Sequence, residues 1–172
     1  MRAFAANGYR LRHARLEVRV VYSGFLLLTL VGMATMAAFQ MYHIGLSPAR
    51  IATFYRGGEL DGQMVFAKTL RELVEMTHFH AFIFGVIYLV LAHLFIATSV
   101  TPTVKMGLVI LGFVGFFSDL LAPWLIRFVA GGFAPLALIA WLSEWISFGA
   151  YVGVPLWEMW SPGDDDDDVG LE

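Results

Sequence analysis

Four long apolar segments constrain what this chain can fold into more than any other feature. They cover residues 20–42, 76–98, 106–130 and 133–157. A helix needs roughly 20 mostly apolar residues to cross the hydrocarbon core of a bilayer, and each segment meets that length. Because backbone in lipid must satisfy its hydrogen bonds within the protein, such segments cross as helices. We therefore predict an all-α integral membrane protein whose residues 20–160 form a four-transmembrane-helix bundle.

The composition supports a membrane protein and excludes several functions. Charged residues make up 15% of the 172 residues, whereas a typical soluble domain has about 25%. Cysteine is absent, which excludes disulfides, thiolate metal sites and covalent c-type haem attachment. The motifs of serine hydrolases, P-loop enzymes, zinc metalloproteases and dinucleotide-binding folds are also missing. No nucleic-acid-binding motif is present, so we expect no nucleic-acid partner.

The distribution of charge predicts the orientation of the bundle. Residues 1–19 form a basic segment with five arginines, and Lys and Arg collect on the cytoplasmic side of membrane proteins. We therefore place the N-terminus in the cytoplasm of a bacterial inner membrane, and four crossings return the C-terminus to that side. The first span exceeds the core of about 7–15 residues found in signal peptides, so we expect it to be retained. Residues 161–172 contain five consecutive aspartates and are predicted to form a disordered tail.

A connection over residues 43–75 links the first two spans on the predicted external side. Ser47 suits an N-cap, Pro48 suits the first position of a helix, and Gly57-Gly58 ends the segment. This pattern predicts a short helix that lies at the external interface. The residues after Met64 keep helical spacing without a breaker, so we expect the second long helix to begin near Met64.

Ionisable residues inside the spans mark candidate functional positions, because burying such groups in lipid is costly. On the second helix, a rotation of about 100° per residue gives Glu75, His78 and His93 one common face, which we predict to face the interior. His80 points away from that face. We expect it to contact another helix, the headgroups or a partner subunit.

A second set of polar residues lies on the third and fourth helices. A rise of about 1.5 Å per residue places Asp119 and Glu144 at a similar depth near the middle of the membrane. Ser147 and Tyr151 follow Glu144 on one face of the fourth helix, as does Glu158. The third helix offers a face of small residues around the acid, formed by Gly112, Gly115, Ser118, Asp119 and Ala122.

These polar residues allow two interpretations. His93, Asp119, Glu144, Ser147 and Tyr151 together form either a proton relay from the middle of the membrane to the cytoplasmic side or a hydrogen-bonded polar lock that fixes helix packing.

Histidines near helix ends suggest a b-type haem. Two axial imidazoles must face each other from different helices, and His43 and His78 both lie at the external end, with His80 as the substitute for His78. Arg127 is predicted to pair with the haem propionates. The alternative is that His43 and His78 bond to backbone, lipid headgroups or a partner.

A mononuclear metal site is a further candidate. Glu75 and His78 have the Glu-x-x-His spacing of di-iron bundles, but one such motif is too few for a di-iron centre. Together with His43 they are predicted to hold a single zinc or copper ion.

In size, helix number and histidines near the helix ends, the chain is similar to small four-helix membrane cytochromes b, a likeness that covers the spans alone. From the candidate ligands we predict a small membrane subunit of a redox assembly that binds one haem b near the external side and exchanges electrons with the quinone pool. The expected partners are the lipid bilayer and other membrane or external-side redox subunits. The alternative function is a cofactor-free accessory or scaffold subunit of a larger membrane complex.

Overall fold

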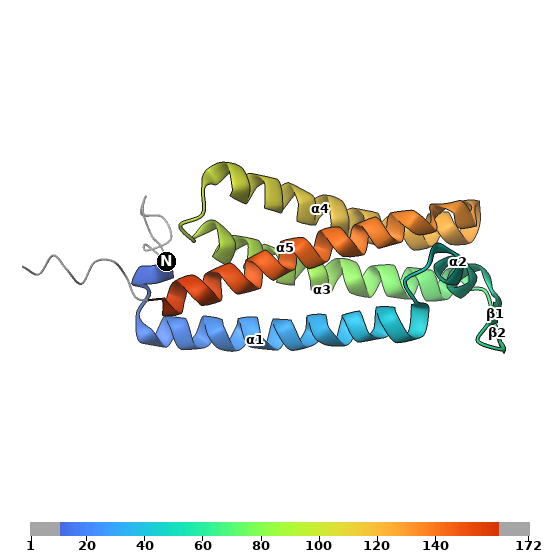
Figure 1. The fold of residues 1–172 in the computed structure, drawn as a ribbon, viewed down its shortest axis with the longest axis horizontal. Helices are drawn as coiled ribbons and strands as arrows, with labels where there is room; N and C mark the ends of the chain where they lie inside the picture. Colours follow the sequence, from blue (N-terminus) through green and yellow to red (C-terminus); the bar gives the residue numbers. More distant parts are fainter. Residues whose placement is uncertain (1–10, 162–172) are drawn as a thin grey trace, which may run out of the picture.

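The computed structural model describes residues 11–161 and contains four long helices that run side by side (Figure 1). These are α1 (Leu16–Phe39), α3 (Leu70–Ile96), α4 (Pro102–Trp124) and α5 (Ala134–Trp160). Short helical turns flank them, namely η2 (Leu11–His13), η3 (Gln40–Ile44), η4 (Leu125–Val129) and η5 (Gly131–Phe133). All four long helices are apolar enough to cross a membrane, which confirms the predicted four-helix membrane bundle.

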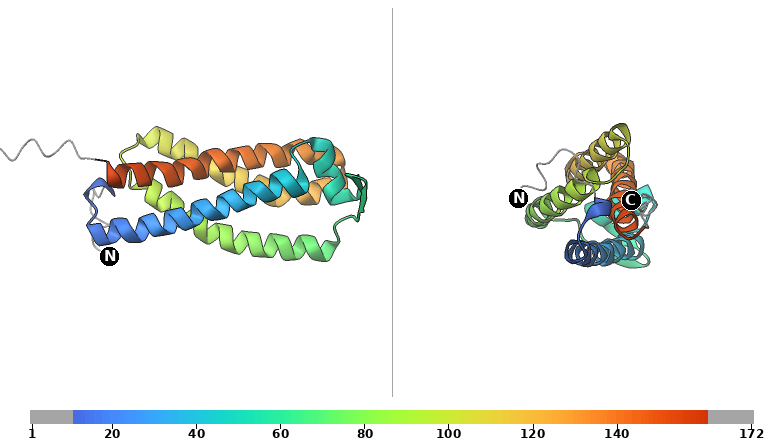
Figure 2. Two further views of the ribbon diagram at one scale, coloured as in Figure 1. Left: turned by 60° about the horizontal axis from the view of Figure 1, so that its bottom comes forward. Right: turned by 90° about the vertical axis from the view of Figure 1, so that its left-hand side faces the viewer.

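The helices alternate in direction, so the described chain begins and ends at the same end of the bundle (Figure 1, Figure 2). The connection between α1 and α3 covers the opposite end, which we call the α2 end after the short helix α2 (Pro48–Arg56) within it. Part of the predicted basic segment, residues 1–10, and nearly all of the predicted acidic tail, residues 162–172, lie outside the described residues.

Local sequence determines where α2 begins and ends. The Ser47 side chain accepts a hydrogen bond from the Arg50 amide at 3.3 Å, and Pro48 occupies the first turn. Gly57 follows the helix with a φ of 84°, a left-handed value that favours glycine. The short helix predicted in this connection is therefore confirmed.

The segment after α2 differs from its prediction. Strands β1 (Gly58–Leu60) and β2 (Gln63–Val65) pair in an antiparallel hairpin. Asp61 and Gly62, with φ values of 50° and 77°, form the turn, and an Asp-Gly pair favours this primed type of hairpin turn. Helix α3 therefore begins at Leu70 rather than near Met64. Thr69 and Glu72 form a capping box at this start.

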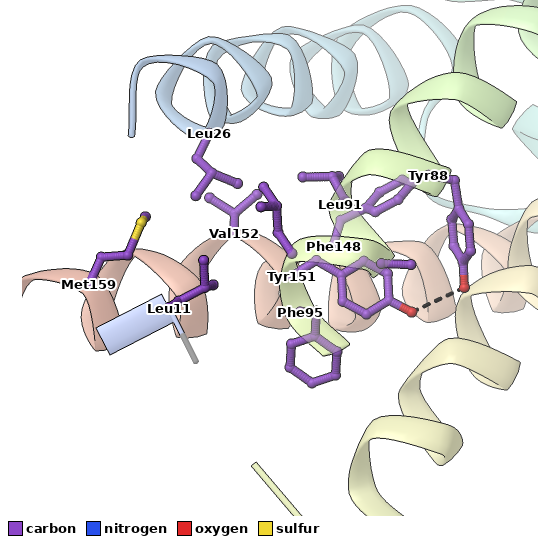
Figure 3. Packing of buried hydrophobic residues seen from close by; sticks show 11 residues of the cluster. Leu11, Leu26, Tyr88, Leu91, Phe95, Phe148, Tyr151, Val152 and Met159 are labelled. Atoms are coloured by element: carbon purple, nitrogen blue, oxygen red, sulfur yellow. Dashed lines mark hydrogen bonds between the residues drawn. The ribbon is translucent and has the colours of Figure 1, made fainter. Parts of the chain in front are cut away.

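Buried side chains form two apolar clusters. The terminal cluster lies toward the chain ends and includes Leu26, Phe95, Phe148 and Tyr151 (Figure 3). The α2-end cluster joins the short helix to the bundle and contains Ile44, Ile51, Tyr55, Leu73, Ala122, Ile126, Ala134, Ala137 and Trp141.

Small residues bring α4 and α5 into close contact. A methyl group added at Gly115 would lie 2.9 Å from the Ser143 Cβ, and Gly112 and Ala122 are also buried. The predicted small-residue face of α4 is therefore the surface that packs against its neighbours, as expected for helices that associate in lipid.

Helix α1 packs far less closely than the other three. Among its described side chains, Leu26 is the one that is buried. Its ends are fastened by hydrogen bonds, from the Trp160 indole to Ser23 at 2.8 Å and from the Trp145 indole to Gln40 at 3.3 Å. The part of α1 between Leu26 and Gln40 is thus loosely seated on the bundle.

The close contact at Gly115 predicts a large and specific loss of stability. Gly115→Val should lower the free energy of unfolding by about 1–3 kcal/mol, because overpacking forces side chains and backbone to shift. Gly107→Val is the matched control on the same helix, since a Cβ there meets nothing within 4 Å. Unfolding by SDS titration in mixed micelles measures both variants, and equal stability would contradict the proposed packing.

The ion pair across the hairpin predicts a dependence on pH. The Arg50 guanidinium donates to both Asp61 carboxylate oxygens at 2.7 and 2.9 Å. These hydrogen bonds, followed by the charge of Arg50, hold the pKa of Asp61 below its ordinary value of 3.8. The stabilisation is therefore fully present above pH 3.8 and is lost as the pH falls through the lower folded pKa.

Amide hydrogen exchange of residues 58–65 measures this effect. Above pH 3.8, exchange should be faster in Asp61→Asn than in the unaltered protein at the same pH. The difference should vanish at lower pH, and Glu59→Gln in the same hairpin serves as the control. A difference that persists in strong acid would show that the ion pair is not its cause.

Candidate functional site

Three ionisable side chains lie at one level of the bundle, between the two apolar clusters. They are His80 on α3, Asp119 on α4 and Glu144 on α5. On α5, Trp141 belongs to the α2-end cluster and Phe148 to the terminal cluster, so Glu144 lies between them. The same order holds on α3, where Met76 and Phe84 flank His80. The bundle therefore has a polar middle layer.

Asp119 is the centre of this layer. Its Oδ1 accepts a hydrogen bond from the Trp141 indole at 2.8 Å. The charge of Asp119 interacts with both His80 and Glu144, so the three groups from three helices face one another. Because an ionisable group in the middle of a membrane is costly, such a set marks a functional site by default.

Glu144 is the least satisfied of the three. Its Oε1 is buried and has no hydrogen-bond partner among the described residues. A buried acceptor without a partner loses its hydration at a cost of about 1–3 kcal/mol, or more when charged. Such an atom therefore calls for an explanation, and a bound ligand provides one.

A cavity of about 530 Å³ opens next to Glu144, between α1, α3 and α5. Most of its lining is apolar, and it includes Phe25, Leu28, Met33, Phe84, Ile87 and Phe148. The polar groups of the lining include those of Glu144, His80 and Gln40, in addition to Thr29, Thr35 and Trp145. The cavity exists because the loosely seated part of α1 lines it without closing against α3 and α5.

His80 is oriented by its own helix. Its Nδ1 lies 2.7 Å from the Met76 carbonyl oxygen, and its ring stacks on Phe84 with the centroids 5.4 Å apart. Because a carbonyl only accepts, Nδ1 carries the proton and donates it, so Nε2 is the atom that takes up a further proton.

The predicted interior face of α3 is wrong. Glu75, His78 and His93 do share one face, but all three are exposed on the outside of the bundle. His80, predicted to point elsewhere, is the histidine that lines the cavity. The physical reason is position along the helix, because polar side chains near helix ends reach water and headgroups from an outward face.

The predicted haem ligands His43 and His78 lie on the outer surface, and the predicted metal ligands do not form a group that could hold a metal ion. His43 and His78 are exposed, and their rings contact Phe39 and Phe82 at 5.1 Å each. Within residues 11–161, no group of three His, Asp or Glu side chains is close enough to hold a metal ion. The metal site predicted from His43, His78 and Glu75 is therefore wrong for the described chain.

Arg127 has a structural partner in place of the predicted propionate. Its Nε donates to the Lys68 carbonyl at 2.7 Å, and Arg56 donates to the Ile126 carbonyl at 3.0 Å. These two bonds fasten the connection at the α2 end to the last turns before the α4–α5 junction.

The polar residues that follow Glu144 on α5 donate hydrogen bonds to backbone carbonyls. Ser147 donates to the Ser143 carbonyl at 2.8 Å, and Tyr151 donates to the Leu108 carbonyl at 2.8 Å. The Tyr151 and Tyr88 hydroxyls also lie 3.0 Å apart (Figure 3). The hydroxyl protons of Ser147 and Tyr151 are thus donated to carbonyls, and His93 is exposed on the outside of the bundle. For these three residues the geometry favours the polar lock over the proton relay.

Glu158 completes this lock at the end of the bundle. Its Oε2 accepts hydrogen bonds from the Ser99 amide at 2.6 Å and the Ser99 hydroxyl at 2.8 Å. It thereby fixes the turn between α3 and α4 against the last turns of α5.

Several residues of the site are missing from the sequence prediction. Trp141 holds Asp119, and Gln40 and Trp145 border the cavity. Trp141 lies three residues before Glu144, on the same face of α5, which is the pattern that points to it. Nothing in the sequence of α1 indicates that it stands away from α3 and α5.

Comparison with known families supplies an independent classification. Residues 45–166 match the family model of the Aq_1264_TM transmembrane helical domain. The chain belongs to this family. The matched residues of the Aq_1264_TM domain include α2 through α5 and all three members of the polar layer. Neither the curated proteins nor the solved structures gave a match.

The Trp141–Asp119 hydrogen bond predicts a non-additive pair of substitutions. Trp141→Phe should lower the free energy of unfolding by about 1–3 kcal/mol, because it leaves a buried carboxyl unpaired. Asp119→Leu in the Trp141→Phe background should recover most of that loss, since no polar group then remains unpaired. A double-mutant cycle by SDS unfolding measures the coupling, and strictly additive effects would show that the bond does not contribute.

Proposed function

We propose that this membrane protein binds a lipophilic molecule of the quinone class in the cavity between α1, α3 and α5. The observation that carries the proposal is the buried, unpaired Oε1 of Glu144 at the wall of an otherwise apolar cavity of about 530 Å³. Pockets of such size and lining, with few placed polar groups, are typical of small-molecule sites.

The polar groups suit a head group that both accepts and donates hydrogen bonds. A quinol hydroxyl would donate to the Glu144 carboxylate, and a quinone carbonyl would accept from a protonated Glu144 or from His80 protonated on Nε2. The apolar wall formed by α1 and α3 suits the isoprenoid tail, which enters from lipid where α1 is loosely seated. Binding at this site therefore requires no transfer of the ligand through water.

The redox role predicted from the sequence enters this proposal through the quinone. The chain has no cysteine for an iron–sulfur cluster, so in this proposal a partner subunit or the predicted haem exchanges electrons with the quinone. A haem b on His43 and His78 is a separate prediction. Both rings lie on the outer surface, so a partner subunit would have to complete the haem pocket.

The alternative is a cofactor-free scaffold subunit that binds no lipophilic ligand. The two functions differ in what Glu144 should do. A binding site uses the unpaired carboxyl oxygen at its cavity wall to orient the head group, whereas a scaffold has no use for a carboxyl in that place. Ligand binding by the purified chain therefore separates the alternatives.

Quenching of tryptophan fluorescence by decylubiquinone tests the proposal in lipid nanodiscs. The quenching should saturate, and Trp145→Phe should remove most of the saturable part, because Trp145 borders the cavity. Trp157→Phe is the control, since this side chain is 71% exposed and absent from the cavity lining.

Two further variants test the location. Glu144→Leu should weaken binding roughly tenfold or more, the effect of losing about 1.5 kcal/mol, without lowering stability. Gly32→Phe should block the cavity, while Gly24→Phe on the same helix should not, since a Cβ at either position meets nothing within 4 Å and only Gly32 lines the cavity. Quenching that rises without saturation, equally in all variants, would show simple partition into lipid.

A further inference from the structure

A second cavity, of about 440 Å³, lies on the other side of the polar layer, toward the α2 end. Residues from all four long helices line it, together with residues of η3, α2 and the segment that precedes α3. Lys68, Glu72 and Glu75 contribute charged side chains from the beginning of α3, where the helix leaves the membrane. Asp119 and His80 lie at its deep end. The cavity therefore connects charged groups at the surface to the acid in the middle of the bundle.

The deep end is electrostatically connected to the short helix above it. Tyr55 of α2 lines the cavity, and burial, followed by the charge of Asp119, raises the pKa of its hydroxyl. Asp119 is therefore close enough to act on groups outside the membrane-spanning helices. Trp141, which holds Oδ1 of Asp119, lines the same cavity.

The two cavities meet at His80. Met36, Phe39 and His80 line both of them, and of these three only His80 can carry a proton. Glu144 lines the first cavity and Asp119 lines the second. His80 therefore borders the cavity of each carboxyl group, with its Nδ1–H fixed on Met76 and its Nε2 left as the atom that can accept a proton.

No ion pair among the described residues blocks the second cavity between its charged rim and Asp119. Lys68 pairs with Glu72 at 3.4 Å, and Arg71 pairs with Glu75 at 2.7 Å, so the rim carries two balanced ion pairs. Asp119 faces His80 of α3, Glu144 and Trp141 of α5, and Tyr55 of α2. No cation from the described residues pairs directly with Asp119.

We infer that the second cavity is an aqueous vestibule through which protons from the α2 end reach Asp119. Water in the vestibule delivers a proton to the Asp119 carboxylate. Asp119 then gives this proton to Nε2 of His80 and becomes a carboxylate again, and Nε2 releases the proton to the Glu144 carboxylate. The vestibule is inferred from the second cavity alone. Only the final destination of the proton, the head group in the first cavity, rests on the proposed function.

Thiol labelling tests whether the vestibule holds water, and the cysteine-free chain suits it without prior substitution. The reagent is trimethylammonium-ethyl methanethiosulfonate, which is charged and reacts with thiolate in water. Leu120→Cys lines the vestibule, whereas its neighbour Leu121 is 51% exposed on the outer surface and would face lipid. Met76→Cys is a second reporter in the vestibule.

Leu120→Cys and Met76→Cys should react roughly tenfold or more faster than Leu121→Cys, because apolar surroundings suppress the thiolate. In proteoliposomes, reagent added on the side of the α2 end alone should suffice. Equal, slow labelling of all three variants, each first shown to unfold at a normal temperature, would overturn the inference.

An infrared titration tests the proton itself. The protonated carboxyl band that Asp119→Asn removes should grow as the buffer pH falls, because an open vestibule keeps Asp119 in equilibrium with water. A carboxyl band whose intensity does not change with the pH of the buffer would contradict the proposed path. These outcomes are distinct from those of the quinone test, since labelling without decylubiquinone binding overturns only the proposed function, and binding without labelling overturns only the vestibule.

Discussion

The requirement that buried polar groups find partners inside the protein governs this structure. Lipid offers no hydrogen bonds, so backbone and side chains must satisfy one another. Toward the chain ends, Oε2 of Glu158 meets this requirement with Ser99 while Oε1 of the same residue has no partner among the described residues, and Tyr151 meets it with Leu108. At the α2 end, two arginines donate to backbone carbonyls. The polar middle layer meets this requirement only in part. Trp141 donates a hydrogen bond to Asp119, but Oε1 of Glu144 has no partner among the described residues. Of the two buried carboxylate oxygens without a partner among the described residues, Oε1 of Glu144 and Oε1 of Glu158, the one of Glu144 borders the cavity between α1, α3 and α5, and the candidate site lies there.

Much of the fold follows from sequence because its determinants are local. Span length and apolar composition predict the four helices, Ser47 and Pro48 predict α2, and small residues predict the packing face of α4. The hairpin escapes a search for helical spacing, although Asp61-Gly62 is a strong turn pair. A pattern of helical spacing does not exclude a strand in a short segment, and the turn pair is the better guide there.

The site is harder to predict, because it depends on which way each helix faces. Depth counting brings Asp119 and Glu144 to one level, since the rise per residue is fixed. The rotation of about 100° per residue gives only the directions of side chains relative to one another. The prediction assumes that the face with most of the histidines of α3 points inward, and this assumption places Glu75, His78 and His93 on the wrong side of the helix. The membrane removes the usual cue, because lipid and protein interior are both apolar. His80 is therefore identified by the packing of α3 against α4 and α5, not by its own spacing.

The loose seating of α1 has a consequence for exchange with the bilayer. Hydrogen bonds from Trp160 and Trp145 hold α1 near its two ends, and between Leu26 and Gln40 it buries little against α3 and α5. Bending this stretch outward breaks few contacts, and the vacated apolar surface is covered by lipid chains at little cost. Outward bending of α1 would therefore open the cavity toward the lipid within the plane of the membrane, whereas α3, α4 and α5, which carry the polar middle layer, would stay packed.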